Sequence, residues 1–189
     1  EIFDLGSLVK NFDIRKVQKK SATYDQKKFN WISSQHLMRE DSDKVLNRLA
    51  SIDPRWSDSR SQDNLIKIID LMKPRSNSLT DLIDQSRYFF SSPKEFDSAQ
   101  LQKIWKQNTT EIIIELKSVL GAINSWVAIE LESNFKSFMD QKGFGIGKVM
   151  KPMRFLICGS LQGPSLFDLM ELIGKEESLK RINYAINEF

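Results

Sequence analysis

The sequence predicts an all-α fold built from eight or more short helices. No stretch alternates apolar and polar residues with a period of two over the length of a strand. Apolar residues instead recur every three or four positions, as at Val127, Leu131, Phe135 and Phe138, which is the spacing of one helix face. Ser, Thr, Asp and Asn recur where such stripes begin, and Gly or Pro where they end.

Five helices are predicted between residues 5 and 90, each identified from its apolar stripe or its capping residue. Their first residues or N-caps are Leu5, Asp25, Ser42, Ser61 and Ser78. The stretch 21–24 is predicted as an extended connector or a short strand. Asp53-Pro54 ends the third helix, and Pro74 stops the fourth. Residues 78–81 have the spacing of a capping box, with Asp81 in place of the usual Glu or Gln.

Ser91-Ser92-Pro93 is the predicted linker, and a domain boundary is expected near residues 91–97. The helices after it are predicted to begin at Thr109 or Thr110, Asn124, Lys148, Gly163-Pro164 and Ser178. Pro164 is expected in the first turn of its helix, where a missing N–H costs nothing. Gly143 and Gly174 are expected at helix C-termini, where a left-handed residue is common.

The composition excludes several classes of protein. The chain has 189 residues, of which 40% are hydrophobic and 28% charged, so it can bury a core in one domain or two small ones. It contains no long uncharged apolar run for a membrane helix, and residues 1–20 lack the apolar centre of a signal peptide. A single cysteine excludes an internal disulfide, so we expect a cytoplasmic protein with no membrane partner.

No catalytic site is predicted within the chain. With one histidine, His36, and one cysteine, Cys158, a zinc site of the Cys/His type cannot form, and no metal site is expected. The run 143–148 is rich in glycine, but it lacks Gly-Lys-Ser/Thr and a preceding strand, so a helix–helix turn explains it better than a phosphate loop. His36 is expected to be a surface or core residue, and Cys158 a small buried hydrophobe.

Two basic groups are the strongest functional candidates. Lys148, Lys151 and Arg154 are spaced by three and share a helix face ahead of the stiff Gly163-Pro164 turn. Arg75 follows Lys73-Pro74 at a predicted helix end. Guanidinium groups, exposed backbone and a rigid turn are suited to holding unstacked RNA bases. Cations at helix C-termini, each favoured by about 0.3–1 kcal/mol, would explain the same residues, and both interpretations stay open at this point.

Four blocks of the sequence occur in the order and spacing of a known family. They are residues 12–17, residues 24–31, residues 71–90 with Lys73-Pro74-Arg75 and Arg87-Tyr88-Phe89-Phe90, and residues 152–175 with Pro152-Met153-Arg154 and Leu172-Ile173-Gly174-Lys175. By these blocks the chain resembles the C-terminal anticodon-binding region of bacterial-type glutamyl-tRNA synthetases, the class I glutamate–tRNA ligases. Ser33, His36 and Gly163 depart from the residues that are usual in this family.

The resemblance implies a division of the chain and a role for it. Residues 1–40 would be the end of the region that contacts the tRNA stem, and 41–95 and 96–189 two small helical anticodon-binding domains. The family ligates glutamate to tRNA-Glu with ATP and Mg in a catalytic domain that precedes this region. The chain alone is therefore expected to hold no cofactor, to be inactive as a ligase, and to be a monomer whose partners are tRNA-Glu and the catalytic domain of one longer polypeptide.

The resemblance also assigns roles to single residues. Arg75 matches the arginine that contacts the last anticodon base, and Arg154 the one that contacts the first. Gly163, Pro164 and Leu166 match the turn around the first two bases. Lys148 and Lys151 are candidate phosphate contacts.

The chemistry of Arg75 fits such a role. Cytosine presents two adjacent acceptors on its pairing edge, which match the planar donors of arginine, whereas guanine presents donors there. Glutamate anticodons end in C and glutamine anticodons in G, so this arginine implies an enzyme that rejects glutamine tRNA.

Two other functions remain as alternatives. The chain could be a helical protein-interaction module whose basic face contacts an acidic partner. It could also be a complete enzyme with its site in a cleft between the helical domains. The first predicts binding that ignores the anticodon, and the second predicts activity from the chain alone with shifted titratable groups in that cleft.

Overall fold

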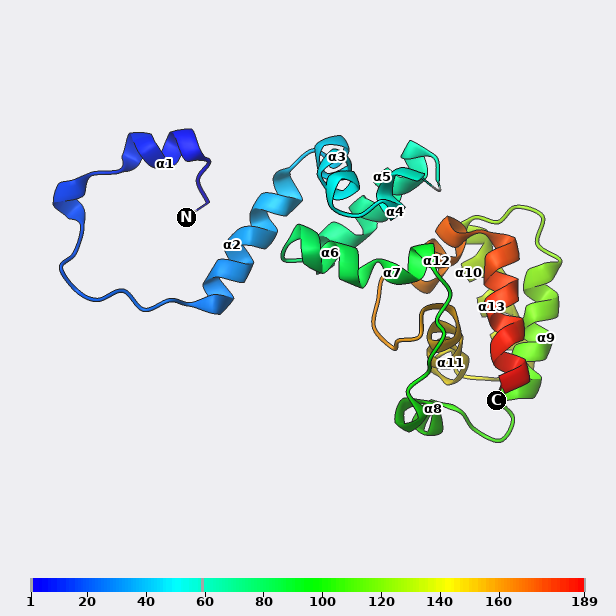
Figure 1. Ribbon diagram of the computed structural model, residues 1–189. Coiled ribbons are helices and arrows are strands. Elements are labelled where there is room, and N and C mark those ends of the chain that lie inside the picture. The colour runs from blue at the N-terminus through cyan, green and yellow to red at the C-terminus, as the bar shows by residue number, and fades with distance from the viewer. Residues whose placement is uncertain (1, 59, 189) are drawn as a thin grey trace.

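The computed structural model describes residues 2–58 and 60–188, and every regular element in these ranges is a helix (Figure 1). The predicted all-α fold is thus confirmed. The first elements are α1 (Leu5–Asn11), η1 (Ile14–Lys16), α2 (Gln26–Arg39), α3 (Ser42–Ile52), α4 (Arg55–Asp58), α5 (Gln62–Met72), η2 (Lys73–Arg75), α6 (Leu79–Gln85) and α7 (Arg87–Phe90). They are followed by α8 (Ser98–Ile104), α9 (Thr109–Gly121), α10 (Ala128–Lys142), α11 (Gly147–Cys158), α12 (Leu166–Ile173) and α13 (Lys175–Glu188).

Residues 2–25 lie apart from the other helices and bury none of their side chains (Figure 1). The stretch 21–24 forms the extended connector that the sequence predicted, without a strand. Asp25 caps α2 as expected, accepting the backbone N–H of Lys28 at 3.0 Å. Large apolar side chains stay exposed along this stretch, among them Leu5, Val9, Phe12 and Ile14.

A first helical group, α3 to α7, packs around the aliphatic stripe of α5. The stripe predicted from the sequence is buried at Leu65, Ile68, Ile69 and Met72. It meets Val45, Leu46 and Leu49 of α3 and Leu82 of α6 in one cluster, so three short helices that could not stand alone share one apolar centre. Ser61 caps α5, and Ser78 caps α6, as predicted. Asp41, one residue before the predicted Ser42, caps α3.

A second helical group, α9 to α13, is a bundle in which α9 packs against α10, α11 and α13 (Figure 1). Its centre contains Ile113, Leu116, Phe135, Phe155 and Ile182. Residues 91–97, where the sequence predicted a linker, carry no helix. The apolar core nevertheless continues across them, because Phe89 of α7 is fully buried and α7 contacts both α11 and α12.

The starts of α10 and α12 differ from the prediction. Asn124 does not cap α10, which begins at Ala128, and the carboxylate of Glu171 accepts the Ala128 N–H at 2.6 Å instead. The acceptor at this helix start is thus a residue 43 positions away, where a local capping residue was expected. Pro164 lies before α12 rather than in its first turn, because Ser165 is the N-cap.

The last turns follow the prediction more closely. Gly143 ends α10 in a left-handed conformation and Gly174 ends α12 with a positive φ. The final helix starts at Lys175, three residues before the predicted Ser178.

Candidate nucleic-acid interface

A cavity of about 680 Å³ opens between the two helical groups. One wall comes from η2, α6 and α7, and the other from the turn that joins α11 to α12. Its lining residues are Pro74, Arg75, Asp84, Gln85, Tyr88, Ser160, Gln162 and Gly163. Two residue groups that the sequence singled out, at 73–75 and 163–164, therefore meet here although nearly ninety positions separate them.

The two cations of the Lys73-Pro74-Arg75 run have opposite roles. Lys73 is buried, and its ammonium donates to the carbonyl oxygen of Glu40 at 2.6 Å and to the Ser42 hydroxyl at 2.7 Å. It ties η2 to the junction of α2 and α3. Arg75 is exposed at the cavity and makes no hydrogen bond or ion pair with any described residue. Of this basic group, only Arg75 offers free donors to a ligand in the cavity.

Arg154 holds the turn on the opposite wall. It projects from α11, and its Nη1 donates to the carbonyl oxygen of Pro164 at 2.5 Å. Its Nε and Nη2 donate to no other described residue, so most of its donors stay available. The side chain is half-buried, which limits its rotamers and fixes the direction of the remaining donors.

Gly163 gives the turn its shape. Its φ of +149° lies in a region that side chains rarely adopt, and a Cβ there would stand 3.3 Å from Arg154 Nη1 and 3.5 Å from the Tyr88 hydroxyl. Pro164 and Leu166 were expected to contact bases as well. Both are buried, so each can present only backbone or a small edge of its side chain to a ligand.

Tyr88 lines the cavity near both arginines, and the sequence analysis assigned it no role beyond its block. Its hydroxyl donates to the Met72 sulfur at 3.5 Å. Burial raises the pKa of the phenol well above its ordinary value, against the opposing charges of Arg75 and Arg154. Tyr88 is thus a neutral aromatic wall of the cavity, close enough to Arg75 and Arg154 for both charges to act on it. A single tyrosine before two phenylalanines is not a sequence pattern that predicts a cavity wall.

Lys148 and Lys151 lie outside the cavity lining. Both are exposed in the first turns of α11, and the Lys148 ammonium stands 4.5 Å from the centre of the Phe144 ring. The N-terminus of a helix is the end that disfavours cations, so the helix dipole does not account for these two lysines.

The remaining candidates have ordinary structural roles. Residues 143–146 form a turn between α10 and α11, as the sequence indicated. His36 is exposed on α2. Burial raises the pKa of the Cys158 thiol, which donates to the Arg154 and Ser160 carbonyls. No group of His, Cys, Asp and Glu side chains in the described residues could hold a metal ion, and no described helix is long and apolar enough to cross a membrane.

A family model described as an anticodon binding domain matches residues 44–186, which include the whole cavity. The chain belongs to the anticodon-binding domain family. Within this family, the chain corresponds to the C-terminal part of glutamate–tRNA ligases, as the sequence blocks indicated.

The relatives of this anticodon-binding domain are much longer proteins. Glutamate–tRNA ligases of Flavobacterium psychrophilum and Flavobacterium johnsoniae are 34% and 33% identical to it over 98% and 99% of the chain. The chain spans only 37% of the length of either relative.

Solved structures give the same result. The crystal structure of a glutamate tRNA ligase from Elizabethkingia meningosepticum in complex with its amino acid matches 96% of this chain with a TM-score of 0.87 and 32% identity. That of glutamate-tRNA synthetase from Elizabethkingia anophelis matches with a TM-score of 0.84 and 30% identity. The chain covers 36% of each of those chains.

Proposed function

We propose that this chain recognises the anticodon of glutamate tRNA as the C-terminal part of a glutamate–tRNA ligase. The cavity between the two helical groups supports this proposal, because Arg75 lines it beside the neutral side chain of Tyr88, and Arg154 holds the turn on the opposite wall with donors that remain unused. Such a site favours unstacked bases, which offer flat faces and hydrogen-bond acceptors. Residues 1–40 would end the region that contacts the tRNA stem, and 41–95 and 96–189 would form the two anticodon-binding domains.

Within that cavity, Arg75 is proposed to bind the last anticodon base. Its planar donors match the N3 and O2 acceptors of cytosine and oppose the N1 and N2 donors of guanine. An unpaired donor in such a contact costs about 1–3 kcal/mol, so one arginine can separate glutamate tRNA from glutamine tRNA. Arg154 is proposed to bind the first base with the donors that Pro164 does not use, while Lys148 and Lys151 contact phosphates.

The parent ligase is proposed to act in the cytoplasm as a monomer that joins glutamate to its tRNA with ATP and Mg. Both would bind outside this chain. The alternative of a protein-interaction module is less well supported. An acidic protein partner would bind exposed cations and would make no use of the recess around Tyr88.

The test is binding of the chain to two anticodon stem-loops that differ only in C or G as the last anticodon base. At fixed moderate salt we expect tighter binding of the C loop, by about 10-fold or more. Arg75→Gln should reduce this preference to near unity. Arg48→Gln, which replaces an exposed arginine paired with Glu40 outside the cavity lining, should keep it. Equal binding of both loops by the unaltered chain would refute the proposal. Binding that ignores the anticodon but is lost with added salt would favour a simple basic surface.

A further inference from the structure

A buried guanidinium joins the two walls of the anticodon cavity. Arg181 of α13 is only 3% exposed, and its Nη1 donates to the carbonyl oxygen of Tyr88 at 2.8 Å and to that of Ile157 at 2.7 Å. Tyr88 belongs to α7 and lines the cavity. Ile157 belongs to α11, one helical turn after Arg154. One nitrogen therefore bridges the backbones of the two elements that carry the opposite walls.

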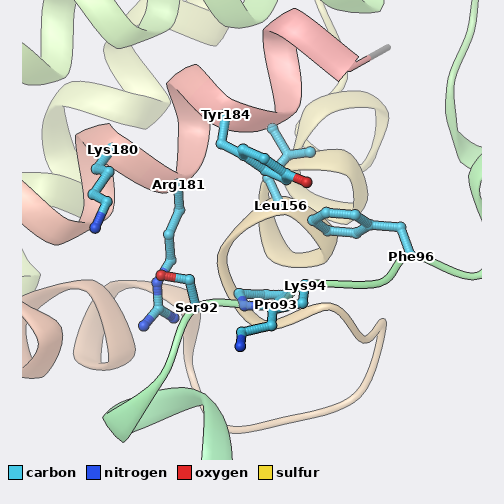
Figure 2. A pocket seen from close by; sticks show the side chains of 8 residues that line it. All are labelled: Ser92, Pro93, Lys94, Phe96, Leu156, Lys180, Arg181 and Tyr184. Atoms are coloured by element: carbon cyan, nitrogen blue, oxygen red, sulfur yellow. The ribbon is translucent and has the colours of Figure 1, made fainter.

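The bridge is held in place from its other side. The Nε atom of Arg181 donates to Glu177 Oε1 at 2.8 Å, and the same oxygen accepts the Ser92 hydroxyl at 2.5 Å. Burial opposes ionisation of Glu177, but the hydrogen bonds from Ser92 and Arg181 outweigh it and hold the pKa of the carboxyl below its ordinary value. Figure 2 shows Arg181 reaching from α13 toward Ser92 of the linker. The cation is thus paired, and the linker is fastened to the same centre.

No other arginine among the described residues joins α7 to α11. Arg60 donates to the carbonyl oxygens of Phe89 and Leu172 at 2.5 and 2.6 Å, which fastens α7 to α12. A cavity of about 370 Å³ lies beside Arg181, between the linker and α13, so the packing on this side of the junction is incomplete (Figure 2). The apolar core around Phe89 holds the other side of the junction, and the Arg181 hydrogen bonds hold Tyr88 and Ile157 together on this side.

We propose that Arg181 is a positioning residue for anticodon recognition: it fixes the distance between the wall that carries Arg75 and the wall that carries Arg154. This rests on the proposed function. With rigid walls, a loop with a wrong base at one end is displaced as a whole and loses contacts at the other end. Recognition of the first and last bases is then coupled. With loosened walls, each base is bound independently and the coupling disappears.

Arg181→Lys is the informative variant. It keeps the positive charge beside Glu177, but a single ammonium lacks the planar fork that reaches two carbonyls and a carboxylate together. A second variant, Arg181→Met with Glu177→Gln, removes both charges at once and leaves no unpaired buried ion. Lys180→Met is the matched control, since it removes one exposed cation from the same helix. The Lys180 ammonium lies 3.8 Å from a carboxylate oxygen of Glu177.

The measurement is the affinity of the 189-residue chain for four anticodon stem-loops, with the correct or a wrong base at the first and at the last position. Each wrong base lowers the affinity by some factor. The ratio between the product of the two single-base factors and the factor for the doubly wrong loop is the coupling factor. In the unaltered chain we expect this factor to be at least about threefold, as for residues that share contacts. In Arg181→Lys it should fall to about one, and in Lys180→Met it should stay unchanged.

Circular dichroism at the binding temperature separates positioning from folding. A purely structural loss lowers the folded fraction, which weakens binding of all four loops by one factor and leaves the coupling factor unaltered. A folded Arg181 variant that keeps the coupling factor of the unaltered chain overturns the proposal, as does an unaltered chain that discriminates both bases without coupling. An unaltered chain with no preference for C at the last position refutes the proposed function itself.

Discussion

Arg154 Nη1 donates a 2.5 Å hydrogen bond to the carbonyl oxygen of Pro164, ten residues later in the chain. The arginine proposed to contact the first anticodon base therefore also holds the turn against which that base would lie. Its guanidinium can serve both purposes because its donors point in several directions in one plane. A side chain with one donating atom could not hold the Pro164 carbonyl and make a bidentate contact with a base at the same time.

Arg154→Lys should therefore reduce discrimination of the first anticodon base. The charge remains, but an ammonium that holds Pro164 loses the bidentate contact with the base, and we expect the preference to fall by about 1–3 kcal/mol. Stem-loops that differ at the first base measure this change. Lys151→Met is the control, and it should weaken all loops alike and lower the salt dependence of binding. An unchanged preference in Arg154→Lys would place the first base elsewhere.

Gly163→Ala should damage the same turn from the other side. A Cβ would meet Arg154 Nη1 and the Tyr88 hydroxyl within 3.5 Å, and φ at +149° is strained for alanine. We expect unfolding free energy to drop by about 1–3 kcal/mol in urea titrations, with a weaker first-base preference. Gly145→Ala is the matched control, because nothing lies within 4 Å of a Cβ there. Equal stability of the two variants would contradict this account.

The start of α10 should depend on a distant carboxylate. Glu171→Ala would remove the acceptor of the Ala128 N–H, and loss of a cap costs about 0.5–2 kcal/mol. Urea unfolding measures the loss, and hydrogen exchange should quicken in the first turn of α10. Glu132→Ala removes an exposed ion pair with Lys136 on the same helix and should cost less than about 1 kcal/mol. A first turn that exchanges no faster would show that another group caps it.

Acid should loosen the junction at Glu177. The pKa of this carboxyl is below its ordinary value of 4.5 in the folded chain, so its ionised form stabilises the fold above that pH. This contribution is lost as the pH falls from 4.5 through the folded pKa. Glu177→Gln cannot titrate, so its thermal midpoint should decline less than that of the unaltered chain over this range. Glu176→Gln, at an exposed neighbour, controls for removal of a charge. Parallel pH profiles would refute the assignment.

Local signals made most helices predictable from the sequence. Asp25, Ser61 and Ser78 cap helices through their own side chains, and Gly143 ends one through its own backbone, so a few adjacent residues decide each boundary. The α10 start was missed because its cap comes from Glu171, on another helix. Helix periodicity and capping rules use only neighbouring residues, so they cannot predict a contact between residues 43 positions apart.

The site was predictable only in part, for the same reason. The blocks shared with the family pointed to Arg75 and Arg154, and the structure puts Arg75 in the cavity and Arg154 against Gly163 in its lining. The place of Tyr88 near both arginines depends on how α7 packs against α11, which a single sequence does not encode in any local pattern. Burial of Leu166 and Lys73 likewise emerged only from tertiary contacts.

The three residues of η2 have one further consequence. Lys73 points inward to Glu40 and Ser42, while Arg75, two positions later, points outward. Connections between helices usually tolerate insertions and deletions at little cost. This one cannot, since a shift of a single residue would bury the guanidinium or expose the ammonium. The length of the connection between α5 and α6 therefore determines which of the two cations faces the cavity. An insertion or deletion here should be more harmful than most substitutions.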